Sequence, residues 1–201
     1  MHFDPAEVRP SVFYQHMVNC IVPRPIAWVS TISKSGVTNL APFSYFTGVG
    51  SRPPSLLFCP ANNREGKPKD TLRNIQETGD FVVNIVSFAL TEQMNSTAAE
   101  LSCEESEFEA FGIASLESLK VKSPRVAASH VQFECTTLQI LNIGEGPGGA
   151  NIVIGKVVHL HIDDAVLGAR DLVDPDLLDV VGRMGGISYC RTKERFELPR
   201  P

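Results

Sequence analysis

A basic stretch directly before a helical pattern is the first feature suited to chemistry. The sequence KPKDT at 67–71 precedes Leu72 and Ile75, which share one helical face, and Gly79 is typical of a helix end. Asp70 is a good N-cap, so we expect a helix that starts near it. Free N–H groups in the first turn of such a helix attract anions.

Lys67, Lys69 and the hydroxyl of Thr71 make this turn a candidate phosphate cradle. Asp70 carries a negative charge at the same place and would repel a phosphate unless it turns aside. A capped surface helix with solvated lysines explains the same residues. Taken alone, the pattern favours this second interpretation.

A second candidate is the run NLAPFSYF at 39–46, which follows the strand pattern IAWVSTI at 26–32 and a turn at Gly36. Period-two alternation divides the run into two faces, Asn39, Ala41, Phe43 and Tyr45 against Leu40, Pro42, Ser44 and Phe46. Neither face is cleanly polar, and Pro42 has no N–H for a sheet ladder. We expect either an irregular strand whose free backbone groups meet a flat heteroaromatic ligand, or an edge strand at a dimer contact.

The pattern GKVVHLH at 155–161 places His159 and His161 on one face of a strand, about 7 Å apart. A catalytic zinc needs more ligands, and no HExxH motif, carboxylate pair or third histidine accompanies the two. A histidine that lines a cleft and a solvated sheet histidine are the remaining interpretations. We therefore expect no metal site.

Other catalytic signatures are missing from the sequence. No GxSxG elbow exposes a serine nucleophile, and no GxGxxG follows a strand pattern. The glycines of GEGPGG at 144–149 lie between two strand patterns and lack a following lysine, so they predict a flexible hairpin tip.

Composition limits the class of protein. The net charge of −5 argues against nucleic acid as the main partner. No apolar run is long enough for a membrane span, and the N-terminus lacks the apolar core of a signal peptide. The five cysteines are scattered and form no CxxC pair, which indicates free thiols in a reducing compartment. We expect a cytoplasmic protein.

Strand patterns joined by short turns dominate the chain. Strands are expected at 26–32, 38–47, 53–60 and 81–88 and on both sides of the 144–149 turn, with helices near 70–79, at 89–101 and within 174–184. Residues 104–118 resemble an acidic surface insertion. These elements predict a mainly β fold, an antiparallel barrel with peripheral helices, in one domain that spans 1–201.

Several short motifs together resemble one family. They are RPIAWVST (24–31), NLAPFSYF (39–46), PP (53–54), KDT (69–71), IGKVVHLHID (154–163) and GRMGGISY (182–189). In this order they resemble the flavin reductase-like, FMN-binding split-barrel family, and most closely its flavoprotein oxygenase-like branch. The resemblance spans about residues 12–190. It implies an antiparallel split β-barrel and a homodimer whose FMN sites lie near the subunit interface.

The resemblance also implies site residues. The run 39–46 would contact the isoalloxazine ring, and KDT would help to hold the ribityl phosphate. The implied cofactor-binding residues are Arg24, Thr31, Asn39, Ala41, Pro42, Ser44, Tyr45, Lys69, Asp70 and Thr71. His161 falls at the strand position that faces the nicotinamide, with His159 as the alternative. Arg183 and Tyr189 fall in a C-terminal motif associated with closure over the site.

The function implied is that of an FMN-dependent oxidoreductase. NAD(P)H would reduce FMN by hydride transfer, and electrons would pass to oxygen, another acceptor or a partner monooxygenase. An FMN-holding sensor or carrier without turnover is the main alternative, and a dimerisation domain that lost its ligand is a third. Pyridoxamine-phosphate-oxidase-like chemistry is disfavoured, because no basic cluster for its substrate phosphate is identifiable.

Overall fold

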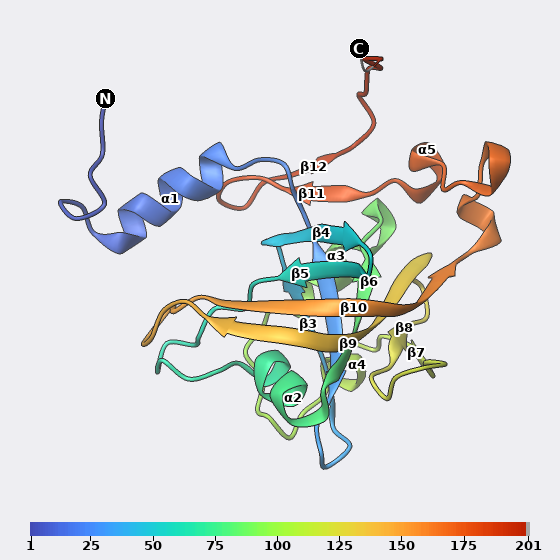
Figure 1. Cartoon of the computed structure of the whole chain (residues 1–201), viewed down its shortest axis with the longest axis horizontal. Helices are drawn as coiled ribbons and strands as arrows, with labels where there is room; N and C mark the ends of the chain where they lie inside the picture. Colours follow the sequence, from blue (N-terminus) through green and yellow to red (C-terminus); the bar gives the residue numbers. More distant parts are fainter. Residues whose placement is uncertain (200–201) are drawn as a thin grey trace.

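The computed structural model describes residues 1–199 and is dominated by strands (Figure 1). The strands are β1 (Arg24–Pro25), β2 (Ala27–Ile32), β3 (Thr38–Phe43), β4 (Phe46–Ser51), β5 (Pro54–Phe58), β6 (Asp80–Ile85), β7 (Ser115–Leu116), β8 (Arg125–Val126), β9 (Val131–Asn142), β10 (Asn151–Ile162), β11 (Val181–Arg183) and β12 (Tyr189–Arg191). The helices are α1 (Pro10–Cys20), α2 (Asp70–Thr78), α3 (Thr91–Ser96), α4 (Glu107–Ala110) and α5 (Pro175–Leu178), with 3₁₀ turns η1 (Phe88–Leu90), η2 (Asp164–Val166) and η3 (Ala169–Asp171).

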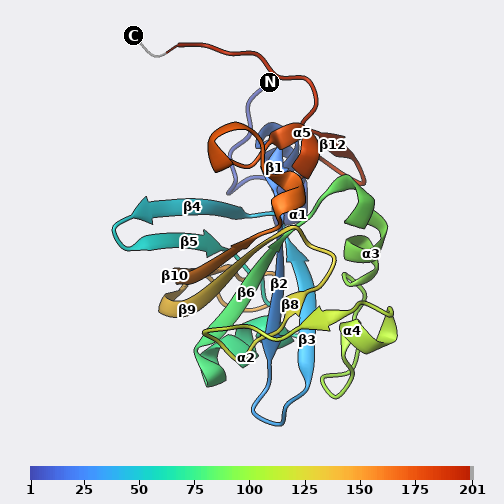
Figure 2. The same cartoon turned by 90° about the vertical axis from the view of Figure 1, so that its right-hand side faces the viewer.

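The main sheet has seven strands in the order β3-β2-β6-β9-β10-β5-β4, and every pairing is antiparallel. Strands β3 and β4 lie at opposite edges of this sheet, although only Ser44 and Tyr45 separate them in the chain. The two edges must therefore come close together, so the sheet curls into an incomplete barrel (Figure 2). The prediction of a mainly β, antiparallel fold is confirmed.

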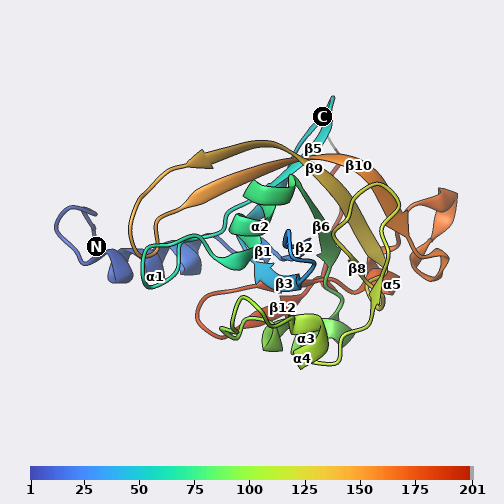
Figure 3. The ribbon, with the colours of Figure 1, turned by 90° about the horizontal axis from the view of Figure 1, so that it is seen from below.

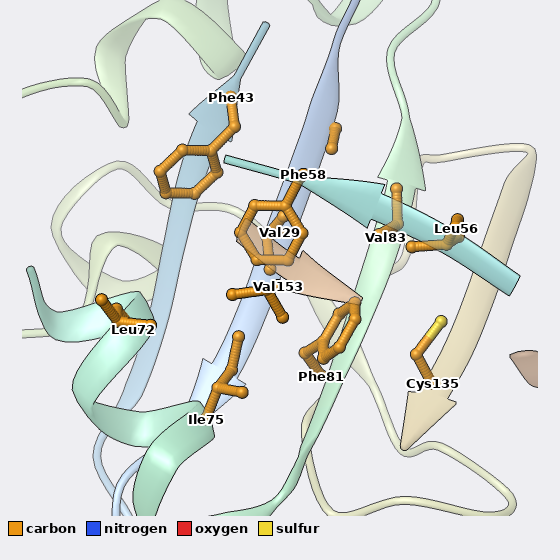
Figure 4. Close-up of a cluster of buried hydrophobic side chains, with 11 residues drawn as sticks. Val29, Phe43, Leu56, Phe58, Leu72, Ile75, Phe81, Val83, Cys135 and Val153 are labelled. Atoms are coloured by element: carbon orange, nitrogen blue, oxygen red, sulfur yellow. The ribbon is translucent and has the colours of Figure 1, made fainter. Parts of the chain in front are cut away.

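The inside of the curl holds the larger core, and helix α2 packs over it (Figure 3). The labelled side chains of Figure 4 are Val29, Phe43, Leu56, Phe58, Leu72, Ile75, Phe81, Val83, Cys135 and Val153. Ring centroids are 5.1 Å apart for Phe43 and Phe58, and 5.4 Å apart for Phe58 and Phe81. These are favourable aromatic contacts. Because Leu72 and Ile75 anchor α2 in this core, the position of the helix start is fixed relative to β2 and β3.

A second core covers the other face of β2 and β3, which explains why neither face of these strands is polar. Trp28 is fully buried there, and its indole N–H donates to Thr97 Oγ1 at 2.9 Å. Phe108 and Ile113 pack into the same cluster. The interpretation of 104–118 as a surface insertion is therefore wrong for this part of the segment, because the apolar residues between its acids carry α4 into the core.

Other boundaries differ from the sequence predictions. The run 38–47 breaks at Ser44 and Tyr45, where the chain leaves one edge of the sheet and turns toward the other. The helix expected over 89–101 ends at Ser96. The helix expected within 174–184 ends at Leu178, since Asp179 adopts a left-handed φ of 48° and β11 follows.

The chain ends form a separate layer beside the main sheet (Figure 1). Helix α1 had no counterpart among the sequence predictions, and β1, β11 and β12 form a three-stranded sheet with one another. In the part of the chain that the structure describes, no helix combines the length and the hydropathy that crossing a bilayer demands.

Candidate functional site

A cavity of about 350 Å³ lies where β3 meets the start of α2. The loop before α2, the segment 97–101 after α3 and Glu107 of α4 complete its wall. Its basic side chains are those of Lys67, Lys69 and Arg73. Six of the residues predicted to bind the cofactor line this cavity: Asn39, Ala41, Pro42, Lys69, Asp70 and Thr71. We call it the first cavity.

The first turn of α2 is open toward an anion. Its N-cap is Lys69, in extended conformation, and no side chain caps the helix. The expectation that Asp70 is the N-cap is therefore wrong: Asp70 is the first helical residue, and its carboxylate pairs with Arg73 at 2.6 Å. This pairing offsets the negative charge of Asp70 at the helix start, whereas the carboxylates of Glu100 and Glu107 also line the cavity. The free N–H groups of the first turn still favour an anion.

Two buried hydrogen bonds fix α2 against the strands. Asn39 Nδ2 donates to Thr71 Oγ1 at 2.9 Å, and Asn74 Nδ2 donates to Thr31 Oγ1 at 3.1 Å. Thr31 is 0% exposed and lines neither of the cavities described here. It supports α2 through Asn74, and its direct contact with a cofactor stays a prediction.

Strand β3 is a regular edge strand, not an irregular one. All six of its residues pair with β2 without a register shift, and Pro42 lies opposite Trp28. The N–H of Leu40 points away from β2, because it donates to Glu107 Oε2 at 2.9 Å. Position 42 shares this orientation, so a residue other than proline would present an N–H at the free edge. Pro42 thus forms cavity wall without leaving a donor that needs a partner.

Glu107 is a buried carboxylate in the wall of the first cavity. Burial raises its pKa, and the negative charge of Asp70 adds to this effect, whereas the hydrogen bond from Leu40 lowers it. Its charge therefore depends on pH in a range above that of an ordinary glutamate.

A second cavity, of about 330 Å³, shares Pro42 and Ala98 with the first. Arg24 and Ser44 line it. The buried Arg24 guanidinium donates to the carbonyls of Val18, Ile21 and Met184 at 2.6, 2.7 and 2.9 Å, and weakly to Ser44 Oγ at 3.4 Å. Arg24 therefore holds α1 and the C-terminal strands against the barrel, in addition to lining the second cavity.

Tyr45 lies outside both cavity walls. Its hydroxyl is buried and has no hydrogen-bond partner within residues 1–199, and the Arg24 guanidinium carbon is 5.9 Å from its ring centroid. Burial raises the pKa of Tyr45, so the hydroxyl stays a neutral donor. Its contact with a cofactor stays a prediction.

His161 also lies outside both cavity walls, on β10. Its Nε2 is 2.6 Å from Oε1 of the fully buried Glu134, and its ring centroid is 4.5 Å from that of His159. The structure therefore brings the predicted β3 and α2 residues together but not His161, whose role at the nicotinamide stays a prediction. Within the described chain no cluster of three metal-ligating side chains occurs.

Comparison with known proteins identifies the family. Residues 18–188 match the family described as "Flavin reductase like domain". The chain belongs to the flavin reductase-like family. An uncharacterized protein of Deinococcus radiodurans is 41% identical over 99% of this chain and 89% of its own length.

Solved structures agree with this assignment. Nitrilotriacetate monooxygenase component B from Bacillus cereus is 32% identical, with a TM-score of 0.93 and 98% of each chain covered. The 2-nitrobenzoate 2-nitroreductase of Pseudomonas fluorescens is 29% identical, with a TM-score of 0.89 and coverage of 100% of this chain and 96% of that one. The split-barrel prediction is confirmed, and the flavin reductase-like family supports a flavin cofactor and flavin-related oxidoreductase chemistry.

The residues present fit a flavin nucleotide. The first cavity joins an uncapped helix start and basic side chains, which suit a phosphate, to an apolar wall of Ala41, Pro42 and Phe43, which suits a ring system. Sequence reasoning missed Arg73 and Glu107. Arg73 follows Lys69 by four residues, a spacing that places both on one side of a helix. Glu107 had no comparable signal, because it lies within a run of acids.

Proposed function

We propose that the chain is an FMN-dependent oxidoreductase that binds FMN in the first cavity and uses NAD(P)H as hydride donor. Electrons then pass to oxygen, another acceptor or a partner monooxygenase. The observation that carries this proposal is the direct connection between the basic start of α2 and the free edge of β3 within one cavity. Bound FMN supplies the hydride-accepting chemistry, so the protein needs no acid–base triad of its own.

The chain's residues bind and orient the nucleotide. Lys69 and the N–H groups of the α2 start hold the phosphate, and Arg73 neutralises Asp70 so that its carboxylate repels the phosphate less. Asn39 positions Thr71 and lies between the phosphate end and the ring end of the cavity. Ala41 and Pro42 offer the ring an apolar surface with no competing backbone donor at position 42.

We further propose that the protein acts as a homodimer. Leu138 and Leu141 are exposed near the end of β9, and exposed apolar side chains on a long strand suit contact with a second copy. In that assembly His161 would serve the hydride-transfer site of the dimer. Sedimentation at micromolar concentration tests the dimer, and a monomer at all concentrations contradicts it.

The decisive experiment measures flavin binding and reduction separately. The purified chain should show a flavin spectrum or bind added FMN with micromolar affinity. Anaerobic mixing with NADH or NADPH should then bleach the visible absorbance band of the oxidised flavin within seconds. Absence of both the spectrum and FMN binding rejects the proposal. Binding without bleaching by either nucleotide identifies an FMN carrier or sensor instead.

His161→Gln tests the role of the histidine. Glutamine can still donate to Glu134, so the fold and the Kd for FMN should be retained, whereas the rate of bleaching should fall. If flavin reduction in the variant is as fast as in the wild type, His161 takes no part in the reaction.

A further inference from the structure

The second cavity carries positive charge without a matching carboxylate. Two arginines, Arg24 and Arg183, line it, and none of its described lining residues is Asp or Glu. This contrasts with the whole chain, whose net charge is −5. A low-dielectric hollow with one sign of charge concentrates ligands of the opposite sign.

The two arginines differ in how many donors remain free. Arg24 is buried, and its donors go to three carbonyls and to Ser44. Arg183 is half-buried, and its side chain makes a single hydrogen bond among the described residues, from Nη2 to the Gly186 carbonyl at 2.6 Å. Glu92 lies in an adjoining hollow that Arg183 also lines, but no ion pair joins the two. Nε and Nη1 of Arg183 are therefore available to an anion.

The orientation of Arg183 is fixed by its neighbours. Its guanidinium carbon lies 4.4 Å from the centroid of the Tyr189 ring, and the Tyr189 hydroxyl donates to Asn95 Oδ1 at 3.2 Å. A stacked guanidinium keeps its planar set of donors pointing in one direction, which suits a planar carboxylate. The amide nitrogen of Asn95, at the same rim, has no hydrogen-bond partner within residues 1–199.

Apart from Gln15, the rest of the lining is mainly apolar and includes flat or flexible side chains. Tyr14, Ile26, Pro42, Met94 and Met184 complete the wall around the arginines. Such a surface buries an aromatic ring well, and methionine adapts to rings of different outline. The volume of about 330 Å³ is at the lower end for small-molecule sites, which run from roughly 300 Å³ upward. It suits one substituted ring and not a whole dinucleotide.

We propose that the second cavity binds a small aromatic carboxylate, with Arg183 and Asn95 on the carboxylate and the methionines and Tyr14 around the ring. Since Pro42 and Ala98 belong to both cavities, this ligand lies directly beside the occupant of the first. The inference deepens the proposed function, because it names the class of second ligand, and it rests on that function only for the identity of the neighbour.

The test uses benzoate as probe and benzamide as its uncharged counterpart. Each is titrated into the full chain with and without FMN, and binding is followed by calorimetry and by amide chemical shifts. Benzoate should bind about tenfold more tightly than benzamide, as expected for a charge-assisted hydrogen bond. Arg183→Met should remove this difference, Arg183→Lys should keep part of it, and Arg170→Met, which removes an exposed arginine elsewhere, should leave it unchanged.

Three results would overturn the proposal. One is saturable binding of neither probe to the wild type. Another is an Arg183→Met variant whose Kd for benzoate is unchanged but whose affinity for NADH is lower, which would mean that the cavity binds the dinucleotide. The third is loss of benzoate binding when FMN is present, which would mean that the flavin fills both cavities. Failure of FMN to bind leaves the benzoate titration of the FMN-free chain intact, so the two proposals fail separately. Thermal unfolding of each variant shows that it is folded.

Discussion

The amide nitrogen of Asn39 lies 2.9 Å from the hydroxyl oxygen of Thr71, and both side chains are buried. This contact joins the edge strand β3 to the first turn of α2 across the floor of the first cavity. It couples the part of the site suited to a ring to the part suited to a phosphate. A change at Thr71 should therefore affect both stability and nucleotide binding.

Thr71→Val keeps the shape of the side chain but removes the hydroxyl. The Asn39 amide then has a buried donor without a partner, which should lower the free energy of unfolding by about 1–3 kcal/mol. The Kd for FMN should rise several-fold, because the first turn of α2 loses its tie to β3. Urea unfolding and FMN titration measure the two effects. Thr47→Val, at an exposed threonine of β4, is the control; equal effects in both variants would contradict the role of the Asn39–Thr71 contact.

Lys69→Ala tests whether the lysine contributes to binding of the FMN phosphate and not of the flavin ring. Lys69 is exposed at the N-cap of α2, so its contribution is electrostatic and screened by salt. The Kd for FMN should rise about three- to tenfold at low ionic strength, and less at high ionic strength. The Kd for riboflavin, which has no phosphate, should stay the same. Lys34→Ala in the turn between β2 and β3 provides the matched control, and an equal loss of riboflavin affinity in Lys69→Ala would place the lysine at the ring.

The sequence predicted the parts of the site that are local in the chain. The helix with Leu72 and Ile75 on its core face, its end at Gly79 and the strand pattern around Gly36 follow from periodicity and turn chemistry, and the structure confirms them. The lysines before this helix predicted a candidate anion-binding turn, which stays a prediction, and the cap was wrongly assigned to Asp70. The Asp70 carboxylate pairs instead with Arg73, three residues later in the same helix.

What the sequence could not supply depends on contacts between distant segments. Glu107 lies 67 positions from Leu40, whose N–H it accepts, and an acidic run gives no sign of such a partner. The expected irregularity of the strand at Pro42 is absent because β3 is the sheet edge and needs no donor there. Pro42 left both an irregular strand and an edge strand open, and the whole strand order decides between them in favour of the edge.

Glu107→Gln should make FMN binding tighter at neutral and higher pH. The buried carboxylate lines the first cavity, where its charge opposes that of a phosphate, and burial raises its pKa. Glutamine Oε1 can still accept the Leu40 N–H. The ratio of wild-type to variant Kd should approach one as pH falls through the raised pKa of Glu107, because the wild-type carboxyl then becomes neutral. Comparison of the two chains at each pH cancels the titration of the FMN phosphate itself.

The same substitution has a defined effect on stability. A carboxyl whose pKa is raised by folding contributes stability that is present below its ordinary pKa of 4.5 and is lost as pH rises through the folded pKa. Glu107→Gln lacks this loss, so it should be as stable as the wild type near pH 7 or more stable. Urea unfolding at pH 5 and pH 8 measures this, and a variant that is less stable by the same amount at both would show a role for Glu107 other than charge.

Glu134→Gln should lower the stability of the fold at neutral pH and have less effect in acid. The fully buried Glu134 carboxylate accepts the N–H groups of Leu119 and Lys120 at 2.8 and 2.6 Å and contacts His161 Nε2 at 2.6 Å. Burial alone would raise its pKa, but these hydrogen bonds outweigh burial and lower it. An amide offers one acceptor and turns an NH₂ group toward the remaining donors, so Glu134→Gln should cost about 1–3 kcal/mol of stability at pH 7.

The pH dependence of that loss identifies the charge as its cause. Because folding lowers the pKa of Glu134, its contribution is present above the ordinary value of 4.5 and disappears as pH falls through the folded pKa. The stability difference between wild type and Glu134→Gln should therefore be largest near pH 7 and shrink at pH values below 4.5. Glu117→Gln, at an exposed glutamate of the neighbouring loop, should cost little at either pH. A difference for Glu134→Gln that persists undiminished in acid would show that packing, and not the carboxylate charge, holds β9, β10 and the 119–120 loop together.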